Sequence, residues 1–373
     1  MSWIAGVGLT SFGRLPGPDA LGWQVSAARS ALADAGRTAA TVDAVLAGYA
    51  TTRNHLMPAN VLAEFLGATP RIALGVSVGG ATGLAMLAQA ARLVDSGAAE
   101  CVLVAAGEDR ASGQTRATQT AVLAQVGQAR YEVPLGGNVP AYYALLASAY
   151  LARYGLEPDA LAPLAVLMRQ HAALTPGAHF SQPITVAEVR AARMIAAPLT
   201  LLDCCPVSDG GAAFVITAAR PAGATAVRIG GLGQANRHQH LLEADLGDVG
   251  AGRAAREAMH AAGVSVADIG VAGIYDSFTI TLAILLEEIG FAAPGQAGAL
   301  AANGAFDRSG PMPLNTHGGL LSYGHCGVAG GMAHVVAVTR ELRAAADRRH
   351  GYVHADGGIL SAHVAAVLTG EPA

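Results

Sequence analysis

The chain has 373 residues, of which 52% are hydrophobic and 13% charged, with a formal net charge of −4 at pH 7. This length and composition predict a compact protein with room for two core-forming units, and they exclude an intrinsically disordered chain. The acidic balance and the absence of a long Lys/Arg run argue against a general nucleic-acid surface.

The sequence carries no recognisable signal for export or membrane insertion. No basic region precedes the first apolar run, so no signal peptide is expected, and no apolar run reaches the roughly 18 residues of a membrane span. The four cysteines, two of them adjacent at Cys204 and Cys205, lack metal-site spacing. We therefore expect a cytoplasmic protein with reduced thiols and no metal site.

The first hundred residues alternate between apolar runs and segments with helical spacing of apolar residues. The runs are continuous, which is typical of strands buried on both faces, and the alternation predicts an α/β layered fold. Strands are expected at 4–8, 43–50, 72–78 and 101–107, and helices at 23–35, 59–65 and 84–95.

Residues 112–202 have a different character, because helical patterns alternate there with polar loops. Thr185 and Glu188 form a capping-box pattern at the start of one of these helices. We interpret the segment as an insertion that covers the sheet and forms a wall of the active site. An Asp209-Gly-Gly turn is then expected to lead into a strand at 212–217.

A second half begins near Ala224 and repeats the pattern of the first. Residues 27–36 align with residues 254–263 at six identical positions of ten. Each repeat also has a Gly-rich loop that leads into a helix, at 79–83 in the first half. This shared order predicts a duplication, with one half at 1–222 and the other at 223–373.

In the second half, the Gly-rich loop is residues 315–331, with six glycines, two histidines, a tyrosine and a cysteine. Dense glycine lets a backbone approach a ligand closely, and a loop that opens onto a helix directs free N–H groups at it. Tyr323 and His325 are therefore placed to stabilise negative charge. We expect the functional surface between the halves, where the two Gly-rich loops converge.

Four motifs together resemble the thiolase superfamily, and within it the sterol-carrier-protein-type thiolase-like branch. The motifs are Tyr275-Asp-Ser-Phe278, the 315–327 stretch Asn-Thr-His-Gly-Gly…Ser-Tyr-Gly-His-Cys-Gly, Ser208-Asp-Gly-Gly-Ala-Ala213 and Gly357-Gly-Ile-Leu-Ser-Ala-His363. The resemblance covers nearly the whole chain. It implies duplicated halves in a five-layer αβαβα thiolase fold, a tight homodimer, and substrates that are coenzyme A thioesters.

The chain departs from the thiolase pattern at the catalytic positions. Gly80 stands where thiolases have their nucleophilic cysteine, and Asp356-Gly-Gly replaces the motif of the second cysteine. Tyr275 replaces the asparagine or histidine of the family motif, whereas His325 is retained, followed by Cys326 instead of proline. Because acyl transfer through a covalent intermediate needs a nucleophile, conventional thiolase chemistry is not expected.

The remaining groups suit a reaction that passes through a thioester enolate. A β-hydroxyacyl-CoA can be cleaved by a retro-aldol step, which needs a proton acceptor for its hydroxyl and stabilisation of the enolate oxygen. This resembles the cysteine-less thiolase-like steroid side-chain aldolases, with tyrosines matching Tyr275 and Tyr323. The resemblance implies a small partner protein with an OB-fold and a zinc ribbon.

We therefore predict a carbon–carbon lyase that cleaves a bulky apolar β-hydroxyacyl-CoA to a ketone or aldehyde and a shorter acyl-CoA. The predicted catalytic residues are Tyr275, Tyr323 and His325. Weaker candidates for the substrate or oxyanion loop are Gly80, His317, Gly358 and His363. No cofactor is expected beyond the coenzyme A of the substrate.

Two other functions remain open at this point. One is acyl transfer or Claisen condensation, with Cys326 or a partner subunit supplying the missing nucleophile. The other is a non-catalytic scaffold that binds CoA esters or lipids. Asp276 is interpreted as a helix N-cap, and His363 also fits a purely structural role.

Overall fold

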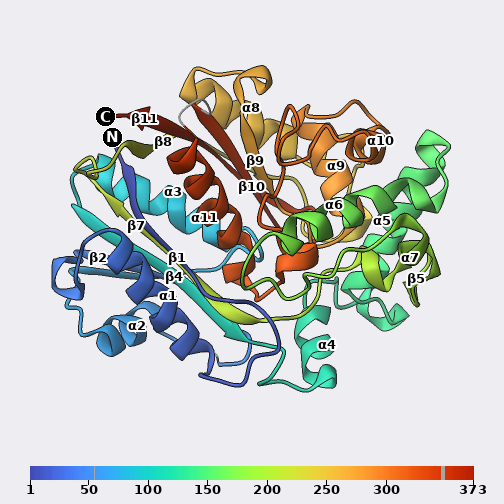
Figure 1. The fold of residues 1–373 in the computed structure, drawn as a ribbon. Coiled ribbons are helices and arrows are strands. Elements are labelled where there is room, and N and C mark those ends of the chain that lie inside the picture. Colours follow the sequence, from blue (N-terminus) through green and yellow to red (C-terminus); the bar gives the residue numbers. More distant parts are fainter. Residues whose placement is uncertain (54, 346–348) are drawn as a thin grey trace.

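A computed structural model gives the fold and describes residues 1–53, 55–345 and 349–373 (Figure 1). The N-terminal half-sheet has the strand order β3-β2-β4-β7-β1. Its strands are β1 (Trp3–Leu9), β2 (Ala44–Gly48), β3 (Ile72–Val76), β4 (Cys101–Asp109) and β7 (Asp209–Thr217). β2 pairs in parallel with β3 and β4, whereas β7 runs antiparallel to β4 and β1.

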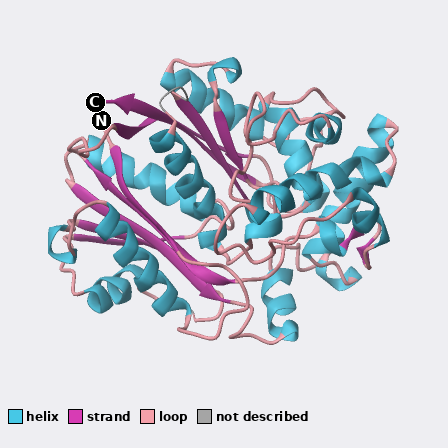
Figure 2. Cartoon of the chain, in the orientation of Figure 1, coloured by secondary structure: helices cyan, strands magenta, loops and turns pink. Residues whose placement is uncertain are grey.

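The C-terminal half-sheet continues the order as β8-β11-β10-β9. Its strands are β8 (Thr225–Asn236), β9 (Val271–Ile274), β10 (His350–Gly357) and β11 (Ala362–Pro372). The register of β1 with β8 pairs Trp3 with Arg228 and Ile4 with Val227. From this short seam, the two half-sheets diverge and leave room for helices between them (Figure 2).

Helices fill the space between the half-sheets and cover their outer faces. α3 (Thr82–Asp95) and α11 (Val328–Ala344) pack on each other in the middle, where α11 contacts β4 and β7 on one side and β9 and β10 on the other. α1 (Ala20–Asp34) and α2 (Pro58–Leu66) pack on the N-terminal half-sheet, and α8 (Ala251–Ala262) and α9 (Thr279–Ile289) on the C-terminal one. The predicted five-layer αβαβα arrangement is therefore confirmed (Figure 1).

Equivalent glycines let a helix lie close to the first strand in each half. A Cβ on Gly8 would lie 2.2 Å from the carbonyl oxygen of Ala27 in α1, and one on Gly233 would lie 2.0 Å from that of Ala254 in α8. Ala27 and Ala254 are aligned positions of the sequence repeat. Glycine is required in both strands because the helix backbone occupies the side-chain space.

Residues 110–208, which connect β4 and β7, lie to one side of the layers (Figure 1). They hold α4 (Arg116–Ala124), α5 (Val139–Tyr154), α6 (Ala162–Ala173), α7 (Val186–Ala191), β5 (Met194–Ala196) and β6 (Leu199–Thr200). α6 packs against α10 (Ala297–Ala302) and the turn Gly319–Tyr323, so this segment borders the Gly-rich loop of the second half. The capping box of Thr185 and Glu188 is present at the start of α7.

The turn expected at Asp209-Gly-Gly is part of strand β7 instead. Asp209 to Gly211 already pair with β4, and Asp209 is fully buried. Its carboxylate accepts hydrogen bonds from the backbone N–H groups of Leu15, Ala111 and Ser112. Neighbouring loops thus supply the partners that allow a charged residue to begin a buried strand.

Among the described residues, no helix has the length and apolarity to cross a membrane.

Candidate active site

The centre of the site is a hydrogen bond between Tyr275 and His325. Tyr275 follows strand β9 directly, and His325 lies in the Gly-rich loop just before α11. The Tyr275 hydroxyl lies 2.9 Å from His325 Nε2, although the residues are 50 positions apart. The structure therefore joins two of the three predicted catalytic residues through their functional atoms.

Gly80 borders this pair and provides the space for the phenol. A Cβ on Gly80 would lie 2.2 Å from the Tyr275 hydroxyl oxygen and 2.4 Å from the carbonyl oxygen of Asp356. Gly80 is not among the glycines with positive φ. Glycine is therefore needed here for space rather than for backbone conformation, and the Tyr275 hydroxyl occupies the place of a side chain at position 80.

A cavity of about 470 Å³ opens beside the pair and is lined by Tyr275, His325 and Gly80. Much of its wall is apolar, with side chains from α4, from the start of α5 and from Phe278. The lining also includes Arg110, Val122, Val126, Tyr143, Phe278, Asp356 and Gly358. The inserted segment between β4 and β7 thus supplies a wall of the cavity, and that wall suits an apolar acyl group.

His325 is held from its backbone and is neutral. Its N–H donates to Ser208 Oγ at 3.2 Å, and its carbonyl oxygen accepts a hydrogen bond from the Ser208 N–H at 3.0 Å. Burial, with a smaller contribution from the positive charge of Arg110, lowers the pKa of His325 to about 3. The imidazole is therefore uncharged near neutral pH, and its Nε2 either accepts a proton or donates a hydrogen bond according to tautomer.

Two buried polar side chains fix the Gly-rich loop to the end of β9: Asp276, which follows the strand, and Asn315 of the loop itself. The buried Asp276 carboxylate accepts hydrogen bonds from the N–H groups of Leu320 and Leu321 at 2.7 and 3.2 Å. The Asn315 amide both donates to and accepts from the backbone of Ile274. The interpretation of Asp276 as a helix N-cap is wrong, because α9 begins after Phe278 without a side-chain cap.

Tyr323 lies in the same loop, but its hydroxyl points elsewhere. It donates to the carbonyl oxygen of Thr10 at 2.9 Å, and the ring packs edge-on against Phe12. Tyr323 does not belong to the set of residues that line the cavity. Burial raises the pKa of its phenol. The structure therefore does not bring Tyr323 to the Tyr275–His325 pair, and its catalytic role stays a prediction.

The weaker candidates divide between the cavity and the core. Gly358 lines the cavity, with a φ of +78°. His363 is buried behind it, where its nitrogens meet His354 Nε2 at 3.2 Å and the Leu360 carbonyl oxygen at 3.1 Å. His317 is buried against His334, with ring centroids 4.9 Å apart. Neither histidine lines the cavity.

Arg110, Tyr143 and Asp356 line the cavity but were not among the predicted site residues. Tyr143 of α5 donates a hydrogen bond from its hydroxyl to Asp356 Oδ2 at 3.1 Å and stacks on Phe278 at 4.4 Å. Burial raises the pKa of the Asp356 carboxyl, which favours its neutral form. The sequence offered one signal, the polar run Glu108-Asp-Arg that follows the buried strand predicted at 101–107.

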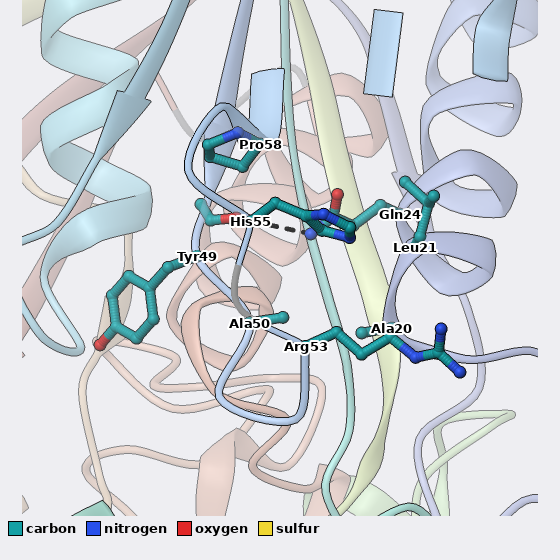
Figure 3. A pocket seen from close by; sticks show the side chains of 9 residues that line it. Ala20, Leu21, Gln24, Tyr49, Ala50, Arg53, His55 and Pro58 are labelled. Atoms are coloured by element: carbon teal, nitrogen blue, oxygen red, sulfur yellow. Dashed lines mark hydrogen bonds between the residues drawn. The ribbon is translucent and has the colours of Figure 1, made fainter. Parts of the chain in front are cut away.

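A segment after β2 brings Tyr49 to the cavity. The Gln24 amide donates to the carbonyl oxygen of Gly48 at 3.4 Å, while Tyr49 points away from Gln24 (Figure 3). Between this segment and α1 lies a pocket of about 10 Å³, enough for about one water molecule. Tyr49 thus borders both this small pocket and the large cavity.

Cys326 is poorly suited to act as a nucleophile. The residue is fully buried, lies outside the cavity lining, and has a thiol pKa that burial raises well above the ordinary value. The thiolate is the reactive form of cysteine, so a raised pKa leaves little of it at neutral pH.

Comparison with known proteins places residues 233–370 in the family described as thiolase C-terminal domain-like. The chain is 32% identical over 365 residues to the steroid side-chain-cleaving aldolase of Thermomonospora curvata, covering 90% of each chain. It is 32% identical over 357 residues to the 17-hydroxy-3-oxo-4-pregnene-20-carboxyl-CoA lyase of Mycobacterium tuberculosis, covering 91% of each.

The similarity also extends to an acyltransferase. The chain is 30% identical over 378 residues to the acetyl-CoA acetyltransferase of Methanothermobacter thermautotrophicus, covering 95% of this chain and 96% of the relative. The solved structure titled "Ltp2-ChsH2(DUF35) aldolase" matches with a TM-score of 0.84 at 29% identity, covering 99% of this chain and 97% of that one. Since similarity spans two reaction types, the side chains of the site must decide between them.

Proposed function

Because the chain belongs to the thiolase superfamily, we propose that it is a lyase that cleaves a β-hydroxyacyl-CoA by a retro-aldol reaction. The products are a ketone or aldehyde and a shorter acyl-CoA. The observation that carries the proposal is the place of the Tyr275 hydroxyl: it binds His325 and fills the side-chain space at Gly80. A phenol that moves protons thus takes the position from which a thiol would attack.

Tyr275 and His325 are both uncharged before the reaction begins, and a proton moves between them during it. Burial raises the pKa of Tyr275 well above its ordinary value, so the phenol is protonated at rest. The substrate hydroxyl gives its proton to Tyr275 Oη as Tyr275 gives its own to His325 Nε2. The hydroxyl electrons form the new C=O bond while the C–C bond breaks, and its electron pair moves onto the thioester as an enolate. The enolate carbon then takes a proton from Tyr275 Oη, and Tyr275 regains its proton from His325 Nε2, so both side chains return to their resting state.

The apolar wall formed by Val122, Val126 and Phe278 supports a bulky apolar acyl group, and the names of the two lyase relatives support a steroid side chain. Of three buried tyrosines in α5, one lines the cavity. Tyr143 lines the cavity, but Tyr142 is buried outside it and Tyr150 donates a hydrogen bond to Glu287.

An assay on a panel of β-hydroxyacyl-CoAs with steroid, terpenoid or aryl side chains tests the proposal. We expect stoichiometric release of a carbonyl compound and a shorter acyl-CoA, measured by mass spectrometry. A parallel incubation with acetyl-CoA should leave the mass of the protein unchanged, because Gly80 cannot be acylated. A covalent acetyl adduct, or thiolytic release of acetyl-CoA from a 3-ketoacyl-CoA, would instead favour acyl transfer.

We also propose that a small partner related to the DUF35 subunit of the solved aldolase complex takes part, with the OB-fold and zinc ribbon expected from the sequence. The similarity to that complex supports this assembly. The panel assay is therefore run with and without such a partner. Binding of the chain to the partner is measured separately by gel filtration.

A homodimer through the edge strand β3 completes the proposed assembly. β3 is the outermost strand of its half-sheet, and Leu74 on it is 39% exposed. Two further apolar side chains, Met57 just before α2 and Phe65 in α2, are 59% and 61% exposed. An unpaired edge with apolar side chains favours pairing with a second copy. Leu74→Asp is expected to weaken dimerisation at least tenfold, measured by sedimentation equilibrium. The control is Leu135→Asp, at an exposed residue of the inserted segment, which should leave dimerisation unchanged. If the Leu74→Asp dimer were as stable as the wild-type dimer, β3 would be excluded as the interface.

A further inference from the structure

Arg110 is a buried arginine without an ionic partner. The residue follows β4, is 5% exposed, and its Nε makes no hydrogen bond. No carboxylate within the described residues lies within 4.0 Å of its guanidinium. The nearby Glu108 carboxylate accepts hydrogen bonds from the hydroxyls of Thr51 and Thr52. Burial raises the pKa of Glu108, and the positive charge of Arg110 opposes that rise without forming an ion pair. Because burying an unpaired charge is costly, such a group points to an anion that is bound during function.

The position of Arg110 indicates which part of a ligand it serves. It lines the same cavity as Tyr275 and His325 and is the one Lys or Arg among the described lining residues. Its positive charge acts on both partners of the pair, lowering the pKa of His325 and opposing the rise in the pKa of Tyr275. Arg110 is thus a buried cationic side chain in the wall that also holds Tyr275 and His325.

We propose that Arg110 binds the oxygen anion of the acyl thioester enolate and is a catalytic residue of the lyase. This rests on the proposed function, because the enolate forms when the C–C bond breaks. The Arg110 guanidinium donates hydrogen bonds to the thioester oxygen as that oxygen becomes negative. His325 is neutral at rest and gains a proton only during the reaction, so Arg110 supplies the standing positive charge of the oxyanion site.

The same guanidinium could also bind a carboxylate carried permanently on the acyl group, and the experiment separates these sources. Enolate formation without C–C cleavage is measured as exchange of the α-hydrogens of propionyl-CoA for deuterium in D₂O. The variants are Arg110→Met, which keeps length without charge, and Arg110→Lys, which keeps charge without the planar fork. The affinities of propionyl-CoA and succinyl-CoA are measured in parallel.

We expect Arg110→Met to slow α-exchange by roughly 10²- to 10³-fold, with propionyl-CoA affinity unchanged within about threefold. Arg110→Lys should retain part of the rate. If Arg110→Met exchanged at the wild-type rate and lost only its affinity for succinyl-CoA, Arg110 would be assigned to a substrate carboxylate and the proposal would be overturned. A wild-type protein that catalyses no exchange would also overturn the proposal. Exchange that depends on Arg110 in a protein that cleaves no β-hydroxyacyl-CoA would refute the lyase but leave Arg110 as the enolate site.

Discussion

Replacing Tyr275 by Phe is expected to lower kcat for C–C cleavage by about 10²- to 10⁴-fold, the contribution typical of a positioned general acid–base group. Phe keeps the ring of a residue that is 5% exposed and removes only the oxygen that binds His325 Nε2. The substrate hydroxyl then has no acceptor on the path to His325. Single-turnover kinetics with a cleaved β-hydroxyacyl-CoA measures this loss directly.

The matched control for this substitution is Tyr142→Phe. Tyr142 is also a buried tyrosine, and its hydroxyl makes no hydrogen bond among the described residues. It lies outside the cavity lining, so its loss should leave kcat within about twofold. Binding of the CoA thioester should persist in both variants, because neither removes a wall of the cavity.

Tyr323→Phe then separates two versions of the mechanism. Since the Tyr323 hydroxyl donates to Thr10, its removal is expected to cost about 1 kcal/mol of stability and little of kcat. A loss of kcat as large as that of Tyr275→Phe would mean that Tyr323 reorients toward the substrate and shares the proton transfer. A full rate in Tyr275→Phe would refute the assigned role of Tyr275.

The sequence predicted the fold well because its repeats are local and periodic. Six identical positions in the repeat indicated the duplication, and the structure then places glycines in the first strand of each half against alanines of the following helix. Tyr275 and His325 could also be singled out from the sequence, since each lies in a motif with a fixed neighbour pattern. The strand β7 was predicted too short because the partners of Asp209 lie up to 194 residues away.

Other features of the site depend on packing that no local pattern encodes. The direction of the Tyr323 hydroxyl is set by Thr10, which lies 313 residues away in the chain. Arg110 reads as a surface residue after a strand, yet it is 5% exposed. His363 follows a Gly-Gly turn like a loop residue, yet it lies in β11, buried beside His354 of the neighbouring strand β10. In none of these cases does the local residue pattern show what surrounds the side chain.

Gly80→Ala is the second substitution with a large expected effect, because an added methyl group has no room. Its carbon would lie 2.2 Å from the Tyr275 hydroxyl oxygen and 2.4 Å from the Asp356 carbonyl oxygen. Overpacking of this kind costs about 1–3 kcal/mol of stability, and displacement of Tyr275 from His325 should lower kcat about 10²-fold. Gly17→Ala is the control, since its added carbon lies 3.3 Å from Trp23.

A double-mutant cycle with Tyr275→Asn identifies the residue that excludes a side chain at position 80. Asparagine removes the phenol oxygen, so Gly80→Ala should cost at least ~1 kcal/mol less in this background than in the wild type. The Asp356 carbonyl oxygen remains, so part of the cost should persist. Because the Tyr275 phenol fills the space, Gly80→Cys alone should stay unacylated by acetyl-CoA. The double variant Gly80→Cys/Tyr275→Asn should be more stable than Gly80→Cys and should accept more acyl group. Additive effects in the cycle, together with ready acylation of Gly80→Cys, would show that the phenol and a nucleophile can coexist, and the choice between lyase and acyltransferase would then lie outside this pair of positions.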